Sequence, residues 1–410
     1  MHVGIVAPDL RAAGGVRENA LFVARSLQRH LGASVQLVSL ATSRSDSSSI
    51  LLHRPHTWRR PLVERCAVEE FTVDHVGAIG AEIEPARYAG RRAILKLVDG
   101  CDVLHVVCGT PALAHAVTGF TGPVIVHFAS FVRHERHQTT RRENVALDGW
   151  RHLMTSVVGL IERAALRRAD AIIAVNRTRL REARALAGAN TPVDVVHCGV
   201  DTDWFAPGPY REDGYLLTVG RLSDPRKNLP LLLRAYAVAR TRVPNVGKLI
   251  LAGAAAPDPE SRSLMSTPEL LGSVQYVGPL DRRALADLYR GASAFVLSSN
   301  EEGQGIVLVE AMATGLPIIA TSCVGPTEVV SNGVEGLLTP VGSVDAFADA
   351  IARVWANPMR RRQMSQASRQ RAVREFSLER TGARLADVYR ASGVTTGRQR
   401  RPIRPALREA

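Results

Sequence analysis

The sequence has few of the features that mark membrane-spanning or disulfide-stabilised proteins. Its 410 residues, enough for two or three domains, include only five scattered cysteines and no Cys-x-x-Cys pair. This usage argues against a disulfide framework or a zinc finger and fits a reducing cytoplasm. No run reaches the roughly 18–20 uninterrupted apolar residues of a membrane span. The N-terminus shows no basic segment followed by an apolar one, so we expect no secretion signal and a cytoplasmic protein.

Lysine is scarce, although the chain is strongly basic. Lys96, Lys227 and Lys248 are the lysines among 52 basic residues, and the net charge is +13. We interpret the arginine bias as the mark of a GC-rich bacterial genome and the charge as a solvated surface, so no nucleic-acid partner is expected. The second interpretation is a basic face of the N-terminal domain that contacts acidic lipid at the inner face of the membrane.

Short apolar runs alternate with amphipathic helices along both halves of the chain. Continuous apolar runs of this kind are typical of parallel strands buried on both faces. The strands expected in the first half are Val3–Ala7, Val35–Leu40, Val103–Val107, Val124–His127, Ala171–Val175 and Val193–Val196. Those expected in the second half are Tyr215–Val219, Leu249–Ala252, Val274–Val277, Ala294–Leu297 and Pro317–Ala320. The fold class predicted is α/β, with two Rossmann-like doubly wound domains facing a central cleft.

The domain boundaries follow from composition. Residues 1–198 form the predicted N-terminal domain and 199–377 the C-terminal domain, with the Gly- and Pro-containing stretch Cys198–Asp213 as the linker. Residues 41–60 are rich in Ser, Arg and Pro and are expected to form an exposed loop. The Arg- and Pro-rich residues 397–410 are expected to form a flexible basic tail.

The segment from Ser299 to Pro317 carries the strongest chemical signal. It follows an expected strand and opens a helix, which places it at the carboxyl end of a parallel sheet, where ligands bind in such folds. Gly303 and Gly305 allow close approach of the backbone, and the N–H groups of the new helix suit a phosphate. Glu302 and Glu310, on the order of 10 Å apart, can each accept hydroxyl hydrogen bonds. A plain strand–loop–helix with exposed acids is the alternative.

A pair of cations follows the first strand of the second half. Arg221 in Thr-Val-Gly-Arg-Leu and the nearby Lys227 are expected to project from strand ends toward the same ligand. Two fixed cations stabilise the charge that develops on a departing diphosphate. A solvated surface arginine is the alternative for Arg221.

These motifs, taken together, resemble retaining glycosyltransferases of family 4, which have the GT-B fold. The resemblance rests on the Glu302…Glu310 pair, the Arg221…Lys227 pair and the Gly14-Gly15 loop, in the family's order. The segment His197–Phe205 is similar to the family's interdomain stretch. The helix at 378–391 resembles the terminal helix that packs back on the first domain.

The resemblance implies roles for single residues. Glu310 is expected to hold the ribose hydroxyls of a nucleotide sugar, and Glu302 the hydroxyls of the transferred hexose. Backbone groups at Gly303, Gln304 and Gly305, with Arg221 and Lys227, are expected to bind the diphosphate. The remaining implied contacts are Gly15 at the donor phosphates or the acceptor, Val277 and Leu280 at the nucleobase, and His127 at the donor sugar.

One of these positions has an alternative reading, and some depart from the family pattern. His127 is otherwise a strand-end histidine bonded to the backbone. Gln304 stands where many relatives have an aromatic residue and Val324 where glycine is frequent, which leaves the hexose open.

The expected reaction moves a hexose or N-acetylhexosamine from a nucleotide-diphosphate sugar, taken as a UDP-sugar, to an acceptor hydroxyl on a small molecule, glycan or lipid. The resemblance implies retention by front-face attack, so no nucleophile is assigned. No tightly bound metal is expected; the sugar nucleotide is the co-substrate. The N-terminal domain is expected to bind the acceptor and the C-terminal domain the donor. A sugar-nucleotide epimerase or hydrolase and a non-catalytic phospholigand binder are the alternatives.

Two further segments have open interpretations. Asp201-Thr-Asp203 has the DxD form that binds metal in another glycosyltransferase fold, but it falls in the expected linker. The stretch Arg141–Arg168, with Trp150, Leu153, Val157 and Leu160, is either an ordinary packed helix or a basic amphipathic helix that docks on a membrane surface.

Overall fold

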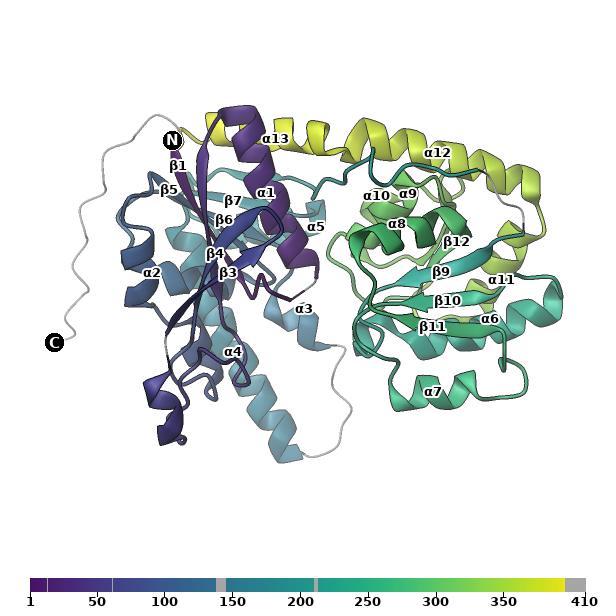
Figure 1. The fold of residues 1–410 in the computed structure, drawn as a ribbon, viewed down its shortest axis with the longest axis horizontal. Helices are drawn as coiled ribbons and strands as arrows, with labels where there is room; N and C mark the ends of the chain where they lie inside the picture. The colour runs from purple at the N-terminus through teal and green to yellow at the C-terminus, as the bar shows by residue number, and fades with distance from the viewer. Residues whose placement is uncertain (13, 61, 138–144, 210–212, 395–410) are drawn as a thin grey trace. The chain divides into compact units, whose positions relative to one another are not determined.

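The protein is described here from a computed structural model that covers the chain except residues 13, 61, 138–144, 210–212 and 395–410. The predicted basic tail, 397–410, lies outside the described residues. The chain divides into two compact units (Figure 1). Unit 1 comprises Met1–Arg136, Arg141–Val196 and the segment from Gly382 onward, and unit 2 is built on His197–Thr381.

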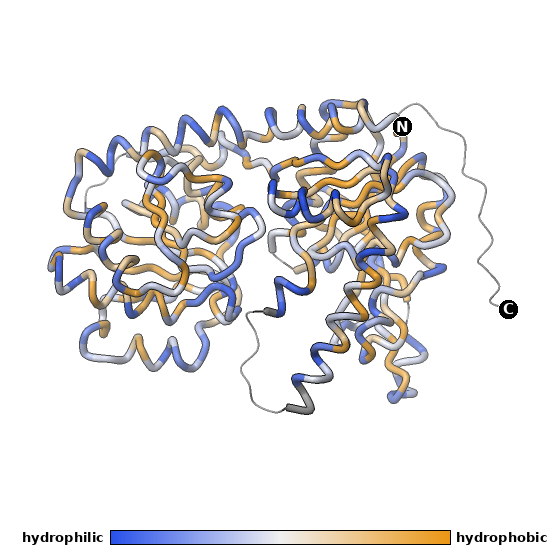
Figure 2. Tube along the Cα trace, turned by 180° about the vertical axis from the view of Figure 1, so that it is seen from behind, coloured by the Kyte–Doolittle hydropathy of each residue, from blue (hydrophilic) through white to orange (hydrophobic). Residues whose placement is uncertain are grey.

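Unit 1 is built on one mixed sheet. Among its described residues eight strands lie in the order β3-β4-β2-β1-β5-β6-β7-β8, and every neighbouring pair is parallel except the antiparallel pair β3–β4. The strands are β1 (His2–Pro8), β2 (Ser34–Leu40), β3 (Val63–Val68), β4 (Phe71–Val76), β5 (Val103–Cys108), β6 (Val124–Phe128), β7 (Ala171–Ala174) and β8 (Val193–Val195). The apolar runs that predicted the parallel strands are buried in the core, where Figure 2 shows hydrophobic residues concentrated.

Helices connect the strands of unit 1. They are α1 (Gly15–Leu31), α2 (Arg92–Leu97), α3 (Val132–His137), α4 (Val145–Arg168) and α5 (Arg177–Leu186), with 3-10 turns η1 (Pro55–Arg59), η2 (Glu84–Tyr88) and η3 (Pro111–Val117). The amphipathic pattern of α1 buries Leu21, Ala24 and Leu27 against the sheet.

Unit 2 is built on an all-parallel sheet. Its described strands lie in the order β11-β10-β9-β12-β13-β14. They are β9 (Tyr215–Val219), β10 (Leu249–Ala252), β11 (Val274–Gly278), β12 (Ala292–Leu297), β13 (Ile318–Thr321) and β14 (Gly336–Thr339). The connections are η4 (Pro225–Lys227), α6 (Leu229–Arg242), α7 (Pro259–Met265), α8 (Arg282–Gly291), α9 (Ile306–Ala313), α10 (Val324–Val329), α11 (Val344–Trp355) and α12 (Pro358–Phe376). The prediction of an α/β fold with two parallel-sheet domains is confirmed.

The prediction that residues 41–60 form an exposed loop holds only in part: residues 43–45, 52–56, 58 and 59 are exposed, but several others are buried. Ser48, Ser49 and Thr57 are fully buried, and Ile50 forms a parallel bridge to Ile79. The Oγ1 atom of Thr57 accepts a hydrogen bond of 2.9 Å from the backbone N–H of Leu51. Small hydroxyl side chains satisfy the buried backbone here, so a polar composition did not imply exposure.

The segment predicted as a linker is held firmly on unit 2 over its first residues. Both polar atoms of the Gln304 side chain bind the backbone of Cys198, at 2.7 and 2.9 Å. Arg369 donates to the carbonyl oxygens of Thr202 and Phe205. These contacts make residues 198–205 part of the unit 2 surface.

The last described helix, α13 (Leu378–Ala391), joins unit 1 from Gly382 onward. Tyr389 is fully buried and its hydroxyl lies 2.8 Å from Nδ1 of His105, while Arg384 forms an ion pair with Asp194. A Cβ atom on Gly382 would lie 2.7 Å from the His30 ring of α1, so a larger residue would force that ring to move. Within the described part of the chain, no helix has the length and apolar character needed to cross a bilayer.

Candidate functional site

The carboxyl edge of the unit 2 sheet brings two predicted residues into direct contact. Strands β9 and β12 are neighbours, so the turns that follow them emerge side by side. Lys227 at the end of η4 places its Nζ atom 2.5 Å from Oε2 of Glu302. Each side chain is about one-sixth exposed, 17% and 16%. A largely buried ion pair at a sheet edge is well placed to bind a charged ligand.

The two turns that carry this pair are joined by further hydrogen bonds. The backbone N–H of Asn300 donates to the carbonyl of Arg226 at 2.7 Å, and the side chains of Asn228 and Asn300 meet at 2.9 Å. Ser298 Oγ donates to the Lys227 carbonyl at 2.9 Å. Because these bonds cross from one turn to the other, the ammonium group is held in place before any ligand arrives.

Glu302 is positioned from the opposite side as well. Ser299 Oγ donates to Oε2 at 3.3 Å, and the carbonyl of Glu302 accepts a bond of 3.0 Å from the N–H of Gly325. A Cβ atom at position 325 would lie 2.9 Å from that carbonyl oxygen, so glycine is required for the approach. Among the described residues nothing donates to Oε1 of Glu302, which leaves an acceptor for a ligand hydroxyl.

Cys323 lies near Glu302 and is not suited to nucleophilic attack. Its thiol is buried, and burial, reinforced by the Glu302 charge, raises its pKa to about 12. The thiol therefore stays protonated at neutral pH, whereas the reactive form of cysteine is the thiolate.

Glu310 lies in α9 and has a buried partner. The hydroxyl of Tyr289 donates to Oε2 of Glu310 at 2.8 Å. Burial and the adjacent carboxylate raise the pKa of Tyr289 well above its usual value, so the phenol remains a donor. This bond fixes the orientation of the Glu310 carboxylate.

The N-terminus of α9 begins at the predicted glycines. Gly305 precedes the helix with a φ of 79°, a left-handed conformation that favours glycine. No side chain caps α9, and the first N–H groups of a helix have no acceptor within it. The Lys227–Glu302 pair lies at this end of the helix. The Lys227 ammonium and the positive end of the helix dipole therefore both favour an anionic ligand at this position.

Gln304 differs from the expectation in one respect. Its side chain is 5% exposed and is used entirely in binding Cys198, so it does not line a sugar pocket. Only its backbone remains available for the predicted diphosphate contact. Glutamine replaces the aromatic residue of many relatives at position 304, and here it serves to bind the backbone of Cys198.

Arg221 lies at the same sheet edge but is not bound to Glu302. Its side chain is 62% exposed and forms an ion pair of 3.2 Å with Asp224. Arg226 binds Asp224 at 2.7 Å. Although burial opposes it, hydrogen bonding and charge from Arg226, with the charge of Arg221, lower the pKa of Asp224. Arg221 is therefore an exposed cation at the edge of the site, whereas Lys227 is held in place by its ion pair.

The predicted nucleobase residues share an apolar cluster with α9. Val277 at the end of β11 and Leu280 after it are half-buried and pack against the core cluster that also contacts Val307. They form a partly open apolar surface on the same side of unit 2, which suits a planar base.

Two predicted residues belong to unit 1. Gly15 begins α1, where the chain leaves the carboxyl end of β1, and it is exposed. His127 is fully buried: Nε2 lies 3.2 Å from the Asn19 amide and Nδ1 3.3 Å from His105. Burial lowers the pKa of His127 to about 3. Both ring nitrogens are thus bound to other side chains of unit 1, and the expected contact of His127 with the donor sugar stays a prediction.

The DxD-like pair is structural. Asp201 Oδ1 accepts backbone hydrogen bonds from Asp203 and Trp204, and Oδ2 forms an ion pair with Arg282 at 3.3 Å. In the described part of the chain, no cluster of three or more His, Cys, Asp or Glu side chains is arranged to hold a metal ion.

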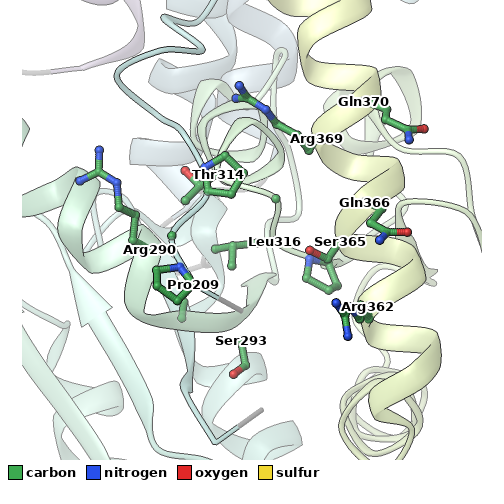
Figure 3. A pocket seen from close by; sticks show the side chains of 15 residues that line it. Pro209, Arg290, Ser293, Thr314, Leu316, Arg362, Ser365, Gln366, Arg369 and Gln370 are labelled. Carbon is green, nitrogen blue, oxygen red and sulfur yellow. The ribbon is translucent and has the colours of Figure 1, made fainter. Parts of the chain in front are cut away.

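A cavity of about 350 Å³ lies at the opposite, amino-terminal edge of the unit 2 sheet (Figure 3). Arg290 and Arg369 line it, but their guanidinium groups donate to backbone carbonyls of the 202–206 segment. None of the predicted site residues lines this cavity. It is therefore separate from the candidate site.

Sequence reasoning missed the residues that hold the site in place. Tyr289 contacts Glu310 from 21 residues away, and Asn228 contacts Asn300 from 72 residues away, which joins the two turns of the site. Ser299 contacts Glu302 from only three residues before it. The one local signal is Asn228, whose positive φ of 47° and side-chain cap on α6 mark a fixed turn after Lys227.

Two family models match successive parts of the chain. The model described as "Glycosyltransferase Family 4" matches residues 13–204, and "Glycosyl transferases group 1" matches residues 201–371. Together they account for both units, and the candidate site lies within the second match.

Curated relatives carry the same kind of name. A D-inositol 3-phosphate glycosyltransferase of Kribbella flavida is 34% identical over 253 residues, covering 57% of this chain and 59% of that protein. That of Mycobacterium tuberculosis is 34% identical over 265 residues, covering 58% of this chain and 53% of that protein. The matches thus span between half and two thirds of these relatives' length.

Solved structures share the fold. Sucrose-phosphate synthase from Thermosynechococcus elongatus superimposes with a TM-score of 0.71 at 21% identity, covering 95% of this chain and 98% of that chain. Anabaena HepE in complex with UDP-glucose gives a TM-score of 0.68 at 17% identity, covering 95% and 99%. At these identities the likeness establishes the GT-B architecture.

Proposed function

Since the chain belongs to the group 1 and family 4 glycosyltransferases, we propose that it transfers a hexose or N-acetylhexosamine from a UDP-sugar to an acceptor hydroxyl, with retention of configuration. The observation that carries the proposal is the Lys227–Glu302 pair beside the N-terminus of α9. A fixed cation and a helix N-terminus bind a diphosphate, and the neighbouring carboxylate binds the sugar attached to it.

The donor contacts follow the order of groups along the sugar nucleotide. The half-buried Val277 and Leu280 would contact the base, and Glu310, oriented by Tyr289, would accept hydrogen bonds from the ribose hydroxyls. Lys227 and the backbone from Gly303 to Gly305 would bind the diphosphate, with Arg221 at the outer side. Glu302 would accept a hexose hydroxyl through Oε1 while Oε2 stays paired with Lys227.

The residues also suit the charges of the reaction. When the bond between the anomeric carbon and the phosphate oxygen breaks, positive charge grows on the sugar and negative charge on the diphosphate. Lys227 and the α9 dipole stabilise the leaving group, and Glu302 lies near the cationic sugar. We propose that the leaving phosphate oxygen takes the proton of the acceptor hydroxyl, which attacks from the same face. No protein nucleophile is assigned, and the protonated Cys323 is unsuited to that role.

The comparisons support a first choice of substrates. The Anabaena neighbours are in complex with UDP and UDP-glucose, and the curated relatives are named for D-inositol 3-phosphate. We therefore propose a uridine nucleotide as the donor carrier and a phosphorylated cyclitol as the first acceptor to examine among small-molecule, glycan and lipid acceptors. Unit 2 would bind the donor and unit 1 the acceptor.

The test is product analysis with UDP-glucose and UDP-N-acetylglucosamine, each with and without inositol phosphate, in the presence and absence of Mg²⁺. We expect UDP release that depends on acceptor and persists without metal, and a glycoside whose anomeric proton coupling shows retention. UDP release without acceptor would indicate a hydrolase, and an isomerised donor an epimerase. UDP binding without any turnover of acceptors would favour a non-catalytic role.

A further inference from the structure

Unit 1 exposes a group of large apolar side chains around η1. Leu52, Trp58, Ile79 and Ile83 are each more than half exposed, with Trp58 at 57%. Ile50, next to Leu51 and Leu52, pairs with Ile79, and the Trp58 indole N–H donates to the Leu51 carbonyl at 3.0 Å. These bonds hold the segments that carry the four side chains next to one another, and we name these four exposed side chains the η1 patch.

Helix α4 exposes a second group. Trp150, Leu153 and Leu160 are 58%, 54% and 64% exposed, and their spacing places them within one arc of the helix. The opposite face of α4 is buried through Val158, Glu162 and Leu166. The helix therefore packs on the unit through one face and presents an apolar stripe on another. The burial confirms the packed helix, and the membrane-docking interpretation stays a prediction.

The patch and the stripe lie at the same end of unit 1. Arg136 connects the two regions. It forms an ion pair with Glu84 of η2, next to Ile83, and donates a hydrogen bond of 3.0 Å to Thr155 of α4. In Figure 1, the dark purple segment that contains η1 and the N-terminal part of α4 both extend from the lower end of the unit 1 sheet.

The charges around these side chains are positive. Arg54 and Arg59 flank Trp58, are exposed, and form no ion pair with any described residue. Arg163 and Arg167 are exposed on α4 beyond Leu160. Of the nearby acids, Glu82 is bound by His53 and Glu84 by Arg136. The η1 patch and the Leu160 end of the α4 stripe thus lie beside exposed arginines, while Arg151 next to Trp150 is paired with Asp148.

We infer that this face of unit 1, the η1 patch with the α4 stripe, docks on an anionic lipid bilayer. Tryptophan and aliphatic side chains enter the headgroup region, and flanking arginines bind lipid phosphates. Charge complementarity selects an anionic bilayer over a second copy of this basic chain, because two copies would bring like charges together. The inference does not depend on the proposed transfer reaction.

The experiment measures binding of the full chain to vesicles, without donor or acceptor. We expect co-sedimentation with phosphatidylglycerol-containing vesicles and not with phosphatidylcholine alone. Brominated lipids should quench tryptophan emission, and Trp58→Ala combined with Trp150→Ala should remove the quenching. Since Trp204 and Trp355 remain in that variant, the loss identifies the two exposed indoles as the inserted ones.

Matched variants separate this face from the general basic charge. Arg54→Glu with Arg59→Glu should reduce vesicle binding about tenfold or more. Arg353→Glu with Arg360→Glu, which changes exposed arginines of unit 2 by the same net charge, should leave binding nearly unchanged. Equal loss in both pairs, or no binding to anionic vesicles, overturns the inference. So does a dimer in light scattering that the tryptophan variants dissociate, because the face would then bind a second copy.

Discussion

Both units have polar side chains in or near their parallel strands, but the two sets differ in charge and exposure. In unit 2, Lys227 and Glu302 are ionised partners that remain partly open at the sheet edge. In unit 1, Asn19, His127, His105 and Tyr389 form a buried chain of neutral groups. The first arrangement has unused donor and acceptor capacity for a ligand, whereas the second uses its capacity internally and holds α1 and α13 on the sheet.

Acid should affect the units unequally, and this is the largest effect we expect. Burial holds the pKa of His127 at about 3 and that of His105 well below its usual value. Below the unfolded pKa of about 6.5 the unfolded state binds protons that the folded state does not, so stability falls as pH decreases. Between pH 7 and 5 His127 should cost about 2 kcal/mol, and His105 should add to the loss in the same direction.

Hydrogen exchange resolved by peptide, at pH 7 and pH 5, measures this difference. Unit 1 should lose protection more than unit 2, whose main segment, His197–Thr381, contains a single histidine, the partly exposed His197. His127→Asn, which keeps one polar group, should make unit 1 less sensitive to pH. Equal loss in both units would contradict the comparison.

Lys227→Ala should slow transfer by roughly 10²–10³-fold, because it removes a preorganised cation at the position of the leaving group. Steady-state kinetics with saturating donor measures the change in kcat. Lys248→Ala is the matched control, since Lys248 is exposed just before β10, at the other end of the sheet. Comparable rates for the two variants would remove Lys227 from the site.

Glu310→Gln should weaken UDP binding by about ten- to a hundredfold, because a charged acceptor for the ribose hydroxyls is lost. Tyr289→Phe should weaken it less, since the carboxylate stays but loses the hydrogen bond that orients it. Calorimetric titration of both variants gives the order. A larger effect from Tyr289→Phe would show that the carboxylate is not the binding group.

Gln304→Ala should lower the free energy of unfolding by about 1–3 kcal/mol through the lost bonds to the Cys198 backbone. The kcat of the folded enzyme should change little. Thermal denaturation and kinetics of the same preparation separate the two outcomes, with the exposed Gln366→Ala as control. A large fall in kcat without loss of stability would show that the Gln304 side chain contacts the substrate.

The sequence alone predicted those features that depend on a single helix or strand. Apolar runs predicted most of the parallel strands, and the position of Lys227 and Glu302 after two such strands predicted that both lie at the same sheet edge, but not their ion pair. It was insufficient where distant elements decide. The hairpin β3–β4 and the edge strand β14 were missed, because alternating or short strands are defined by their partners. His127 and Gln304 were placed correctly along the chain, but the direction of their side chains depends on Asn19, His105 and Cys198.

The most direct test of the site compares the affinities of UDP and UMP, by calorimetry, for the wild-type protein and Lys227→Ala. If Lys227 and the N-terminus of α9 bind the diphosphate, the wild type should prefer UDP strongly, and the variant should lose most of that preference while its UMP affinity changes little. An equal preference for UDP in both proteins, or no binding of either nucleotide to the wild type, would contradict the assignment of this sheet edge as the donor site.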